Sequence, residues 1–290
     1  MKKGKLRKPI DLIKIFLLTL LTAFHFSAIG QNNTYNIFAL AYTGNDKIPV
    51  SEIAVGSKAN DSITGNAMVW LLKGNNGRII LVDAGFTDTA QYPFFNNYIR
   101  PDIVLKEINI NPEDITDLII THPHFDHIGG IDLFPNAMVW MQKDDFHYFV
   151  NTAWQKNGVT VGLNKKDVSK LIEKSTEGKL TLVKGDSIEI IPGIRVFIGS
   201  RHTYESQYVL VNGVSGKTII ASDNIWYYYN LEHLLPIPIT FDPKGYVNAM
   251  KRMKRLVSDS NLIIPGHDAL VLSKFPKVTD RIVRIEKNNK

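Results

Sequence analysis

The chain has 290 residues, an ordinary apolar content of 44% and a formal charge of +6, which suits one large domain or two small ones with a sizeable core. The positive charge does not indicate a nucleic-acid-binding protein, because residues 1–30 hold six lysines and arginines against one aspartate and the remaining 260 residues are nearly neutral. The absence of cysteine excludes disulfide bonds and a lipoprotein anchor.

Residues 1–30 have the pattern of a secretory signal peptide. A Lys/Arg-rich start is followed by an apolar run, Ile15 to Ala23, which is too short for a comfortable membrane span. The small residues Ala28 and Gly30 then suit cleavage before Gln31. We therefore predict an exported protein, periplasmic or secreted, whose domain covers residues 31–290. The alternative is an uncleaved N-terminal anchor, which would give the only membrane contact.

The first part of this domain reads as strands separated by turns. Residues 35–42 form a strand-like run, and the Gly/Asn/Asp/Ser-rich segment 43–65 predicts a long surface loop. Residues 67–72 and 78–82 predict a hairpin, since Asn76-Gly77 between them supplies the positive φ that such turns need.

The rest of the chain alternates predicted helices and strands. We expect helices over 101–108, from Asp144 onward, over 165–177 with Asn164 as N-cap, and over 243–257, and strands over 115–121, 137–142, 194–198, 218–221 and 261–265. The helix at 243–257 has one apolar face and a basic face opposite. A lysine-rich exposed helix face is the commoner meaning of such a pattern, so we do not predict a nucleic-acid-binding surface there.

The segment 121–130 carries the chemistry, with three histidines and an aspartate inside six positions. Crowded imidazoles repel one another on protonation unless a metal ion replaces the protons. His122 and His124, two apart on a loop that leaves a strand, can bind one ion, and Asp126 and His127 on the next turn can bind a second. Zinc takes three or four N/O ligands, and a catalytic site keeps one position for water, so further ligands must come from elsewhere.

Three other strand ends carry residues of the required type: His202, Asp223 and His267. Together with the local cluster they give seven candidate ligands. His147 and His233 have no motif around them, and we expect them to be structural or surface residues.

The motif His-x-His-x-Asp-His, followed by a distal His, a distal Asp and a final Gly-His, resembles the metallo-β-lactamase superfamily, and Val82-Asp83-Ala84-Gly85 resembles its other recurrent motif. The resemblance spans about residues 35–276. Within the superfamily the chain is most similar to the N-acyl homoserine lactonases, on the order and spacing of Asp223 to Glu232, Phe241-Asp242-Pro243 and Ile263 to Asp268.

This resemblance implies an α/β fold, a four-layer αββα sandwich with two zinc ions at one edge of the paired sheets. It implies one zinc bound by His122, His124 and His202, a second bound by Asp126, His127 and His267, and Asp223 bridging the two. Asp83 would orient a ligand, and Asp126 and Asp223 would be the catalytic carboxylates. Manganese, cobalt or iron could replace zinc depending on supply.

The function expected is that of a metal-dependent hydrolase in which a metal-bridging hydroxide opens a lactone similar to an acyl-homoserine lactone. One position departs from the lactonase pattern, because Trp226 stands three residues after the bridging aspartate where lactonases carry a tyrosine. We place Trp226 and Tyr227 in the candidate substrate pocket together with Phe86, while core packing is an equally good explanation for this aromatic run.

Other functions share the motif and stay open. A zinc β-lactamase is the strongest alternative, although such enzymes generally lack the bridging aspartate. Other ester and thioester hydrolases of the superfamily follow, and a non-catalytic metal-binding protein is the alternative from a different class. The expected partner is a small molecule with a cyclic acyl group rather than a nucleic acid.

Overall fold

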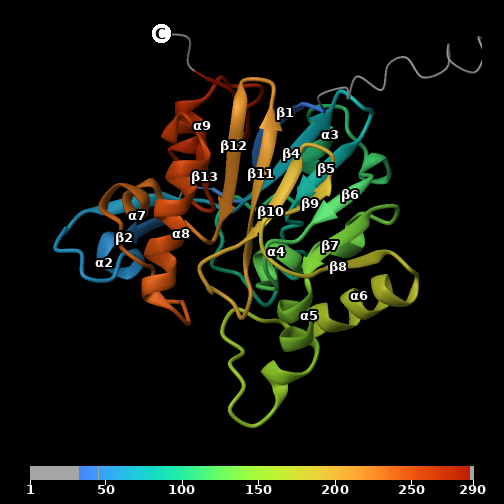
Figure 1. The fold of residues 1–290 in the computed structure, drawn as a ribbon, viewed down its shortest axis with the longest axis horizontal. Helices are drawn as coiled ribbons and strands as arrows, with labels where there is room; N and C mark the ends of the chain where they lie inside the picture. The colour runs from blue at the N-terminus through green and yellow to red at the C-terminus, as the bar shows by residue number, and fades with distance from the viewer. Residues whose placement is uncertain (1–32, 45, 288–290) are drawn as a thin grey trace, which may run out of the picture. The chain divides into compact units, whose positions relative to one another are not determined.

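The computed structural model describes residues 33–44 and 46–287, and Figure 1 shows their arrangement. The leader predicted for residues 1–30 lies outside these ranges. Within them, no helix is both long and apolar enough to cross a membrane.

Strands make up most of the centre of the molecule (Figure 1). Their bounds are β1 Tyr35–Ala41, β2 Asp46–Pro49, β3 Ser62–Gly65, β4 Met68–Gly74, β5 Ile79–Val82, β6 Asp117–Ile119, β7 Met138–Gln142, β8 Leu180–Val183, β9 Ile188–Ile191, β10 Ile194–Ile198, β11 Gln207–Gly213, β12 Gly216–Ser222, β13 Ile263–Pro265 and β14 Ile282–Ile285. The α-helices are α2 Val50–Ile53, α3 Pro101–Lys106, α4 Phe125–Ile128, α5 Lys143–Val150, α6 Lys165–Thr176, α7 Tyr228–His233, α8 Pro243–Leu256 and α9 Val271–Lys274.

Twelve strands form one hydrogen-bonded network that folds into two halves. In the first half, β1 pairs antiparallel with β14 and β4, and β5 to β8 follow. In the second half, β9 to β13 pair with one another. A single parallel pairing, Tyr35 with Gly213, joins the halves between β1 and β11, so they behave as two sheets rather than one flat sheet.

Alternating side chains on these strands build three separate apolar clusters. Tyr35, Ile37 and Ala39 of β1 join Val209 and Val211 of β11 in the cluster between the two sheets. The intervening side chains of the first sheet face a second cluster, which includes residues of α3 and α6. Those of the second sheet face a third cluster with α8. Because successive side chains of a strand point to opposite faces, three clusters mean four layers. The predicted αββα sandwich is therefore confirmed.

Helices cover the two outer faces. In Figure 1, α8 lies on one side of the strands and α6 on the other. Helix α8 buries Tyr246, Met250 and Met253 against the second sheet, as its predicted apolar face requires. Its basic side includes Arg252, which pairs with Asp186 at 2.8 Å.

Most predicted elements are confirmed within a few residues. The β4–β5 hairpin forms with Gly77 at φ 82° in its turn, and Asn164 caps α6 by accepting a hydrogen bond from the Lys166 N–H at 3.0 Å. The last predicted strand is shorter than expected, because Ser260–Leu262 forms a 3-10 turn before β13.

The loop predicted for residues 43–65 was wrong. This segment contains β2, α2 and β3, with β2 and β3 paired antiparallel as a separate two-stranded sheet. Val50 and Ile53 are buried against Tyr227. Burial against this distant part of the chain stabilises the strands and the helix, which the polar local sequence does not predict.

Candidate metal centre

The seven candidate ligands converge from four separate parts of the chain. His122 and His124 lie on the loop after β6, and Asp126 and His127 lie on α4, which follows directly. The other three follow the ends of β10, β12 and β13, in the order His202, Asp223 and His267. Strand ends of a rigid scaffold thus hold side chains that are up to 145 positions apart in the sequence.

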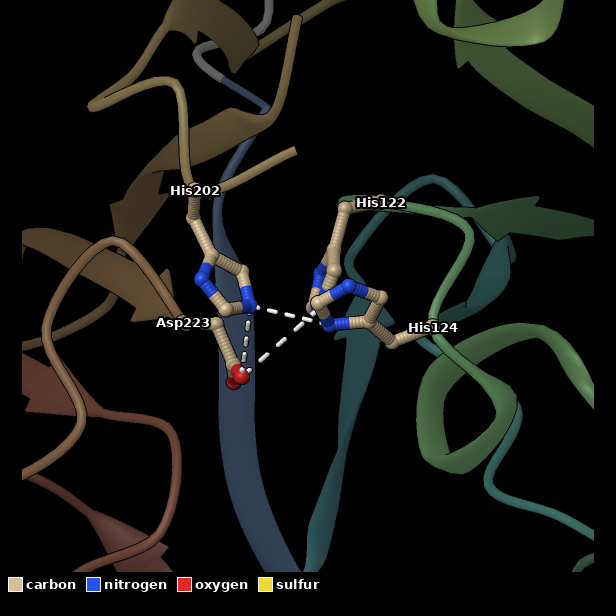
Figure 2. A group of neighbouring side chains, drawn as sticks. All are labelled: His122, His124, His202 and Asp223. Atoms are coloured by element: carbon tan, nitrogen blue, oxygen red, sulfur yellow. Dashed lines mark hydrogen bonds and ion pairs between the residues drawn. The ribbon is translucent and has the colours of Figure 1, made fainter. Parts of the chain in front are cut away.

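His122, His124, His202 and Asp223 form the first group, and all four are buried. Their ligand atoms lie within 4.8 Å of one another, and Figure 2 shows the side chains pointing toward a common centre. His202 Nε2 is 2.9 Å from His124 Nδ1 and 3.2 Å from Asp223 Oδ2. Atoms about 2 Å from a tetrahedral zinc ion are about 3.3 Å apart, so these separations fit a zinc site.

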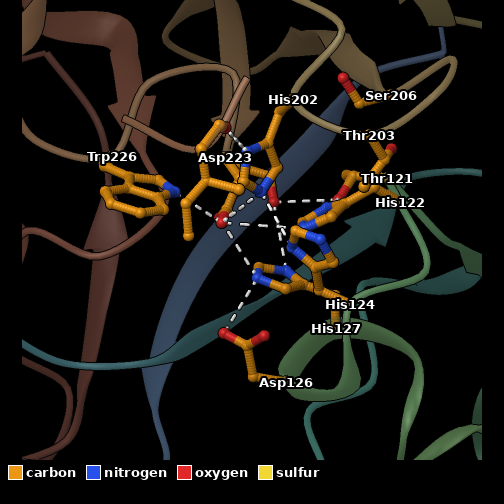
Figure 3. Close-up of polar contacts among 12 residues, drawn as sticks. Thr121, His122, His124, Asp126, His127, His202, Thr203, Ser206, Asp223 and Trp226 are labelled. Atoms are coloured by element: carbon orange, nitrogen blue, oxygen red, sulfur yellow. Dashed lines mark hydrogen bonds and ion pairs between the residues drawn. The ribbon is translucent and has the colours of Figure 1, made fainter. Parts of the chain in front are cut away.

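Asp126, His127 and His267 form the second group. His127 Nε2 is 3.2 Å from Asp126 Oδ2, and His267 Nε2 is 3.6 Å from the same oxygen. Side chains of this group lie beside the first group in Figure 3.

Asp223 spans the space between the two groups. Its Oδ2 faces the first group, 3.7 Å from His122 Nε2 and 3.2 Å from His202 Nε2. Its Oδ1 faces the second group, 3.2 Å from His127 Nε2 and 3.0 Å from His267 Nε2. One carboxylate thus offers an oxygen to each of two cations.

Hydrogen bonds on the far side of the imidazole rings fix which nitrogen faces the centre. His202 Nδ1 lies 2.7 Å from the Ile239 carbonyl oxygen, and His267 Nδ1 lies 3.1 Å from that of Asn66. A carbonyl oxygen can only accept, so Nδ1 carries the hydrogen in both rings and Nε2 keeps a lone pair directed inward.

Asp83 serves the same purpose for His127. Its Oδ2 lies 2.9 Å from His127 Nδ1 and accepts a hydrogen bond from the Ser222 hydroxyl at 2.8 Å. Its Oδ1 accepts from the backbone N–H of Thr121 at 2.8 Å. Asp83 thus links the loops after β5 and β6 to Ser222, the last residue of β12. Its contact with His127 is of the kind that an orienting role requires.

Strained backbone marks three of the loops that surround the centre. Asp83, Arg201 and Ser222 have φ of 61°, 52° and 47°, in the left-handed region that non-glycine residues seldom adopt. Each is a site residue or the immediate neighbour of one. Such conformations persist only where surrounding contacts enforce them, which is common at functional sites.

The charge states of the buried groups suit cation binding. Burial lowers the pKa of His122 well below its usual value and the pKa of His124 to about 3, so both rings are neutral and can donate a lone pair. Burial opposes ionisation of Asp223, but the surrounding histidines hold the pKa of this carboxyl well below its usual value. In the second group, burial opposes protonation of His127 and His267, but the carboxylates of Asp126 and Asp223 raise the pKa of both rings. The first group therefore combines neutral imidazoles with a buried carboxylate, and binding of a cation by the second group would displace protons from its histidines.

Several inward-facing atoms need a partner. His122 Nε2, His127 Nε2 and Asp223 Oδ1 are fully buried, and among the described residues they make the ion-pair contacts given above but no well-directed hydrogen bond. Unsatisfied buried polar atoms are costly and uncommon. Two divalent cations bound between the groups would satisfy all three, so the residues fit the dinuclear zinc centre expected from the sequence.

Trp226 contacts the bridging carboxylate directly. Its indole Nε1–H donates to Asp223 Oδ2 at 2.7 Å, as Figure 3 shows. The residue that replaces the lactonase tyrosine therefore lies at the centre, where it holds the aspartate.

The other two residues assigned to the substrate pocket are buried away from solvent. Phe86 is 1% exposed and packs within an aromatic cluster that includes Tyr98 and Phe125. Tyr227 is 2% exposed and packs against α2. Their assignment to a substrate pocket stays a prediction. His147 and His233 belong to neither ligand group.

Sequence reasoning missed the residues that join the loops. The Asn224 carboxamide oxygen accepts hydrogen bonds from the backbone N–H and the hydroxyl of Ser200, which links the loops carrying Asp223 and His202. Gly266 is also required, since a Cβ there would lie 2.7 Å from Asp223 Oδ1. For Asn224 the position beside a ligand residue was the available signal, whereas Gly266 already belonged to the final Gly-His pair of the sequence motif.

Comparisons with known proteins found a matching family model and a related protein. Residues 63–193 match the family model of the metallo-beta-lactamase superfamily. An N-acyl homoserine lactonase of Bacillus thuringiensis is 26% identical over 236 residues, which cover 73% of this chain and 87% of that protein.

Solved structures share the fold. An N-acyl homoserine lactone hydrolase with its product N-hexanoyl-L-homoserine at the catalytic metal center has a TM-score of 0.67 at 20% identity, covering 84% of this chain and 98% of that one. The dizinc quorum-quenching lactonase AidC has a TM-score of 0.62 at 17% identity, covering 89% and 99%.

Proposed function

Because this chain carries a metallo-beta-lactamase superfamily domain and is homologous to N-acyl homoserine lactonases, we propose that it hydrolyses the ring ester of an acyl-homoserine-lactone-like substrate. The observation that carries the proposal is Asp223, whose two oxygens face the two histidine groups. A shared carboxylate is what a two-cation hydrolase needs, because it sets the spacing of the ions.

The reaction adds water to the lactone carbonyl carbon and breaks the bond from that carbon to the ring oxygen. When bound, two zinc ions would activate the water and polarise the carbonyl. No serine or cysteine nucleophile is required, and the chain contains no cysteine.

The protein's own residues position the centre and manage the proton. Asp223 holds the spacing, and Asp83 fixes the orientation of His127. Asp126 Oδ2 faces His127 and His267, which leaves its second oxygen to receive the proton from water and return it to the departing ring oxygen. Trp226 cannot supply that proton, because the indole N–H donates hydrogen bonds but does not release its proton, and it already donates to Asp223.

The test is a hydrolysis panel on the purified mature domain, with metal content measured on the same sample. Acyl-homoserine lactones, other lactones, β-lactams and simple esters would be compared. We expect two zinc ions per chain and the highest kcat/KM for lactones. Higher activity on β-lactams than on lactones would favour the β-lactamase alternative. Zinc binding without hydrolysis of any substrate class in the panel would support a non-catalytic metal-binding protein.

We further propose that the protein is exported to the periplasm or beyond, on the basis of the charged and apolar pattern of residues 1–30. Fractionation of expressing cells, with N-terminal sequencing of the exported form, tests it. Recovery of the full-length chain from the cytoplasm would contradict it.

A further inference from the structure

The second ligand group depends on a helix of a single turn. Helix α4 spans only Phe125–Ile128, and two of its residues, Asp126 and His127, are ligands of that group. Isolated helices shorter than about 12 residues are marginal in water, and the last carbonyl groups of a helix have no partner within it. Contacts with other parts of the chain must therefore hold α4, and with it the two ligands.

The first sheet supplies two of these contacts. The Tyr42 hydroxyl, just after β1, donates to the Asp126 carbonyl oxygen at 2.6 Å. The Ala84 N–H, in the loop after β5, donates to the carbonyl oxygen of His127 at 2.7 Å. Two carbonyl groups at the end of the turn are thus satisfied by the chain segments that α4 packs against.

Lys170 of helix α6 closes the end of α4. Its Nζ donates to the carbonyl oxygen of Gly129, the C-cap residue of α4, and to the Thr87 hydroxyl oxygen at 3.3 Å. Thr87 lies in the loop after β5, shortly after Asp83, whose carboxylate is hydrogen-bonded to His127 Nδ1. The cation therefore ties to α6 both the helix that carries His127 and the loop that orients its ring.

A buried carboxylate fixes the direction of this lysine. Asp167, one turn before Lys170 on α6, is 2% exposed, and its Oδ1 lies 3.3 Å from Lys170 Nζ. Asp132 Oδ1, on the short turn that follows α4, lies 3.2 Å from the same nitrogen. Removing one partner of a buried ion pair is costly, because the other charge is left without a partner. The ammonium group is therefore held against α4 instead of extending into solvent.

We propose that Lys170 is a positioning residue of the second metal site, which holds Asp126 and His127 where they can share a cation with His267. All four ligands of the first group lie outside the turn Phe125–Ile128, so loss of Lys170 should weaken the second site more than the first. This inference rests on the two-cation centre of the proposed function and is independent of which ester is the substrate.

The test is Lys170→Met, which keeps an unbranched apolar side chain and removes the ammonium group. Competition with a chromophoric chelator resolves two zinc dissociation constants, of which one should rise about tenfold in the variant while the other changes by less than about threefold. Cadmium NMR identifies the weakened site, because each bound ion gives its own signal and couples to the ring protons of its histidines. The signal coupled to His127 and His267 should be lost at ion concentrations that still fill the site of His122.

The matched control is Lys174→Met. Lys174 lies one turn later on α6, is 5% exposed, and donates from Nζ to the Phe134 carbonyl oxygen at 2.9 Å. Neither residue belongs to a ligand group. Both variants lose a contact between a lysine of α6 and a main-chain carbonyl group, so both should lower the stability of the metal-free protein. Only Lys170→Met should lower the affinity of the second site.

A second variant keeps the test valid if the unpaired Asp167 carboxylate prevents Lys170→Met from folding. Lys170→Met combined with Asp167→Asn removes the cation together with its buried partner and should show the same loss at the second site. Unchanged second-site affinity in this double variant, or an equal loss in Lys174→Met, would overturn the inference and leave lactone hydrolysis intact. A selective loss in the variants, with no lactone hydrolysed by wild type, would support the inference and reject the proposed function. Fewer than two zinc ions per wild-type chain would overturn both.

Discussion

Replacing Trp226 by Phe tests the part of the centre where this chain departs from the lactonase pattern. The substitution keeps an aromatic ring but removes the N–H that donates to Asp223 Oδ2 at 2.7 Å. The indole also lies edge to face with His202 and His267, at centroid separations of 5.8 Å and 6.2 Å, so it borders both ligand groups.

The expected magnitude follows from the chemistry of that bond. A hydrogen bond to a charged group contributes about 1.5–3 kcal/mol, and Asp223 is only 3% exposed. If the whole of this energy fixes the carboxylate in its bridging orientation, zinc affinity would fall by about 100-fold, since about 1.4 kcal/mol corresponds to tenfold. Part of the bond's energy also stabilises the metal-free protein, so we expect a loss of about tenfold with 100-fold as the upper bound.

The assay is competition for zinc with a chromophoric chelator, together with the unfolding midpoint of the metal-free protein. The chain offers a matched control in Trp140, whose Nε1–H donates to Asp117 Oδ1 at 3.0 Å, because neither residue belongs to a ligand group. Trp140→Phe should leave zinc affinity unchanged. Equal zinc affinity in Trp226→Phe and wild type, or an equal loss in the Trp140→Phe control, would refute the reasoning.

Three further predictions concern the bridging aspartate, the glycine that packs against His124, and a buried carboxyl group outside the ligand groups. Asp223→Ala should leave fewer than two zinc ions per chain and lower kcat/KM by more than about 100-fold, and full activity with one ion would reject its bridging role. Gly162→Ala should weaken zinc binding, because the added Cβ would lie 2.6 Å from His124 Cδ2. The control is Gly178→Ala, because Gly178 has nearly the same φ (72°, against 74° for Gly162) but no atom within 4 Å of the added Cβ, so this change should only lower stability. Equal zinc affinities of the two variants would contradict the role of the contact with His124. Burial raises the pKa of Asp167 to about 6, above its unfolded value near 3.8, so its contribution to stability is fully present below pH 3.8 and is lost as pH rises through 6. In urea unfolding, the free energy of unfolding of Asp167→Asn should therefore rise by up to about 3 kcal/mol relative to that of wild type between pH 4 and pH 7. A difference in unfolding free energy that does not vary with pH would contradict this.

Local sequence patterns were sufficient for most elements of the sandwich. The alternation of side chains in β1 and β4, the Asn-Gly turn between β4 and β5, and the apolar face of α8 are properties of short segments. Such segments carry their own period and turn chemistry, so they can be identified without knowing what they contact. The segment 43–65 shows the limit, since its hairpin and helix depend on burial against Tyr227 and neighbouring residues more than 160 positions away.

The sequence by itself determined which seven side chains are suited to bind metal, because the spacing of His122, His124, Asp126 and His127 is a local feature and the remaining ligands follow recognisable strand ends. Only the tertiary structure decided how their neighbours hold them. It directs the Trp226 N–H to the Asp223 carboxylate, and it places main-chain carbonyl groups behind the rings of His202 and His267. The physical reason is that the orientation of a side chain arises from long-range packing and hydrogen bonds, which no short stretch of sequence contains.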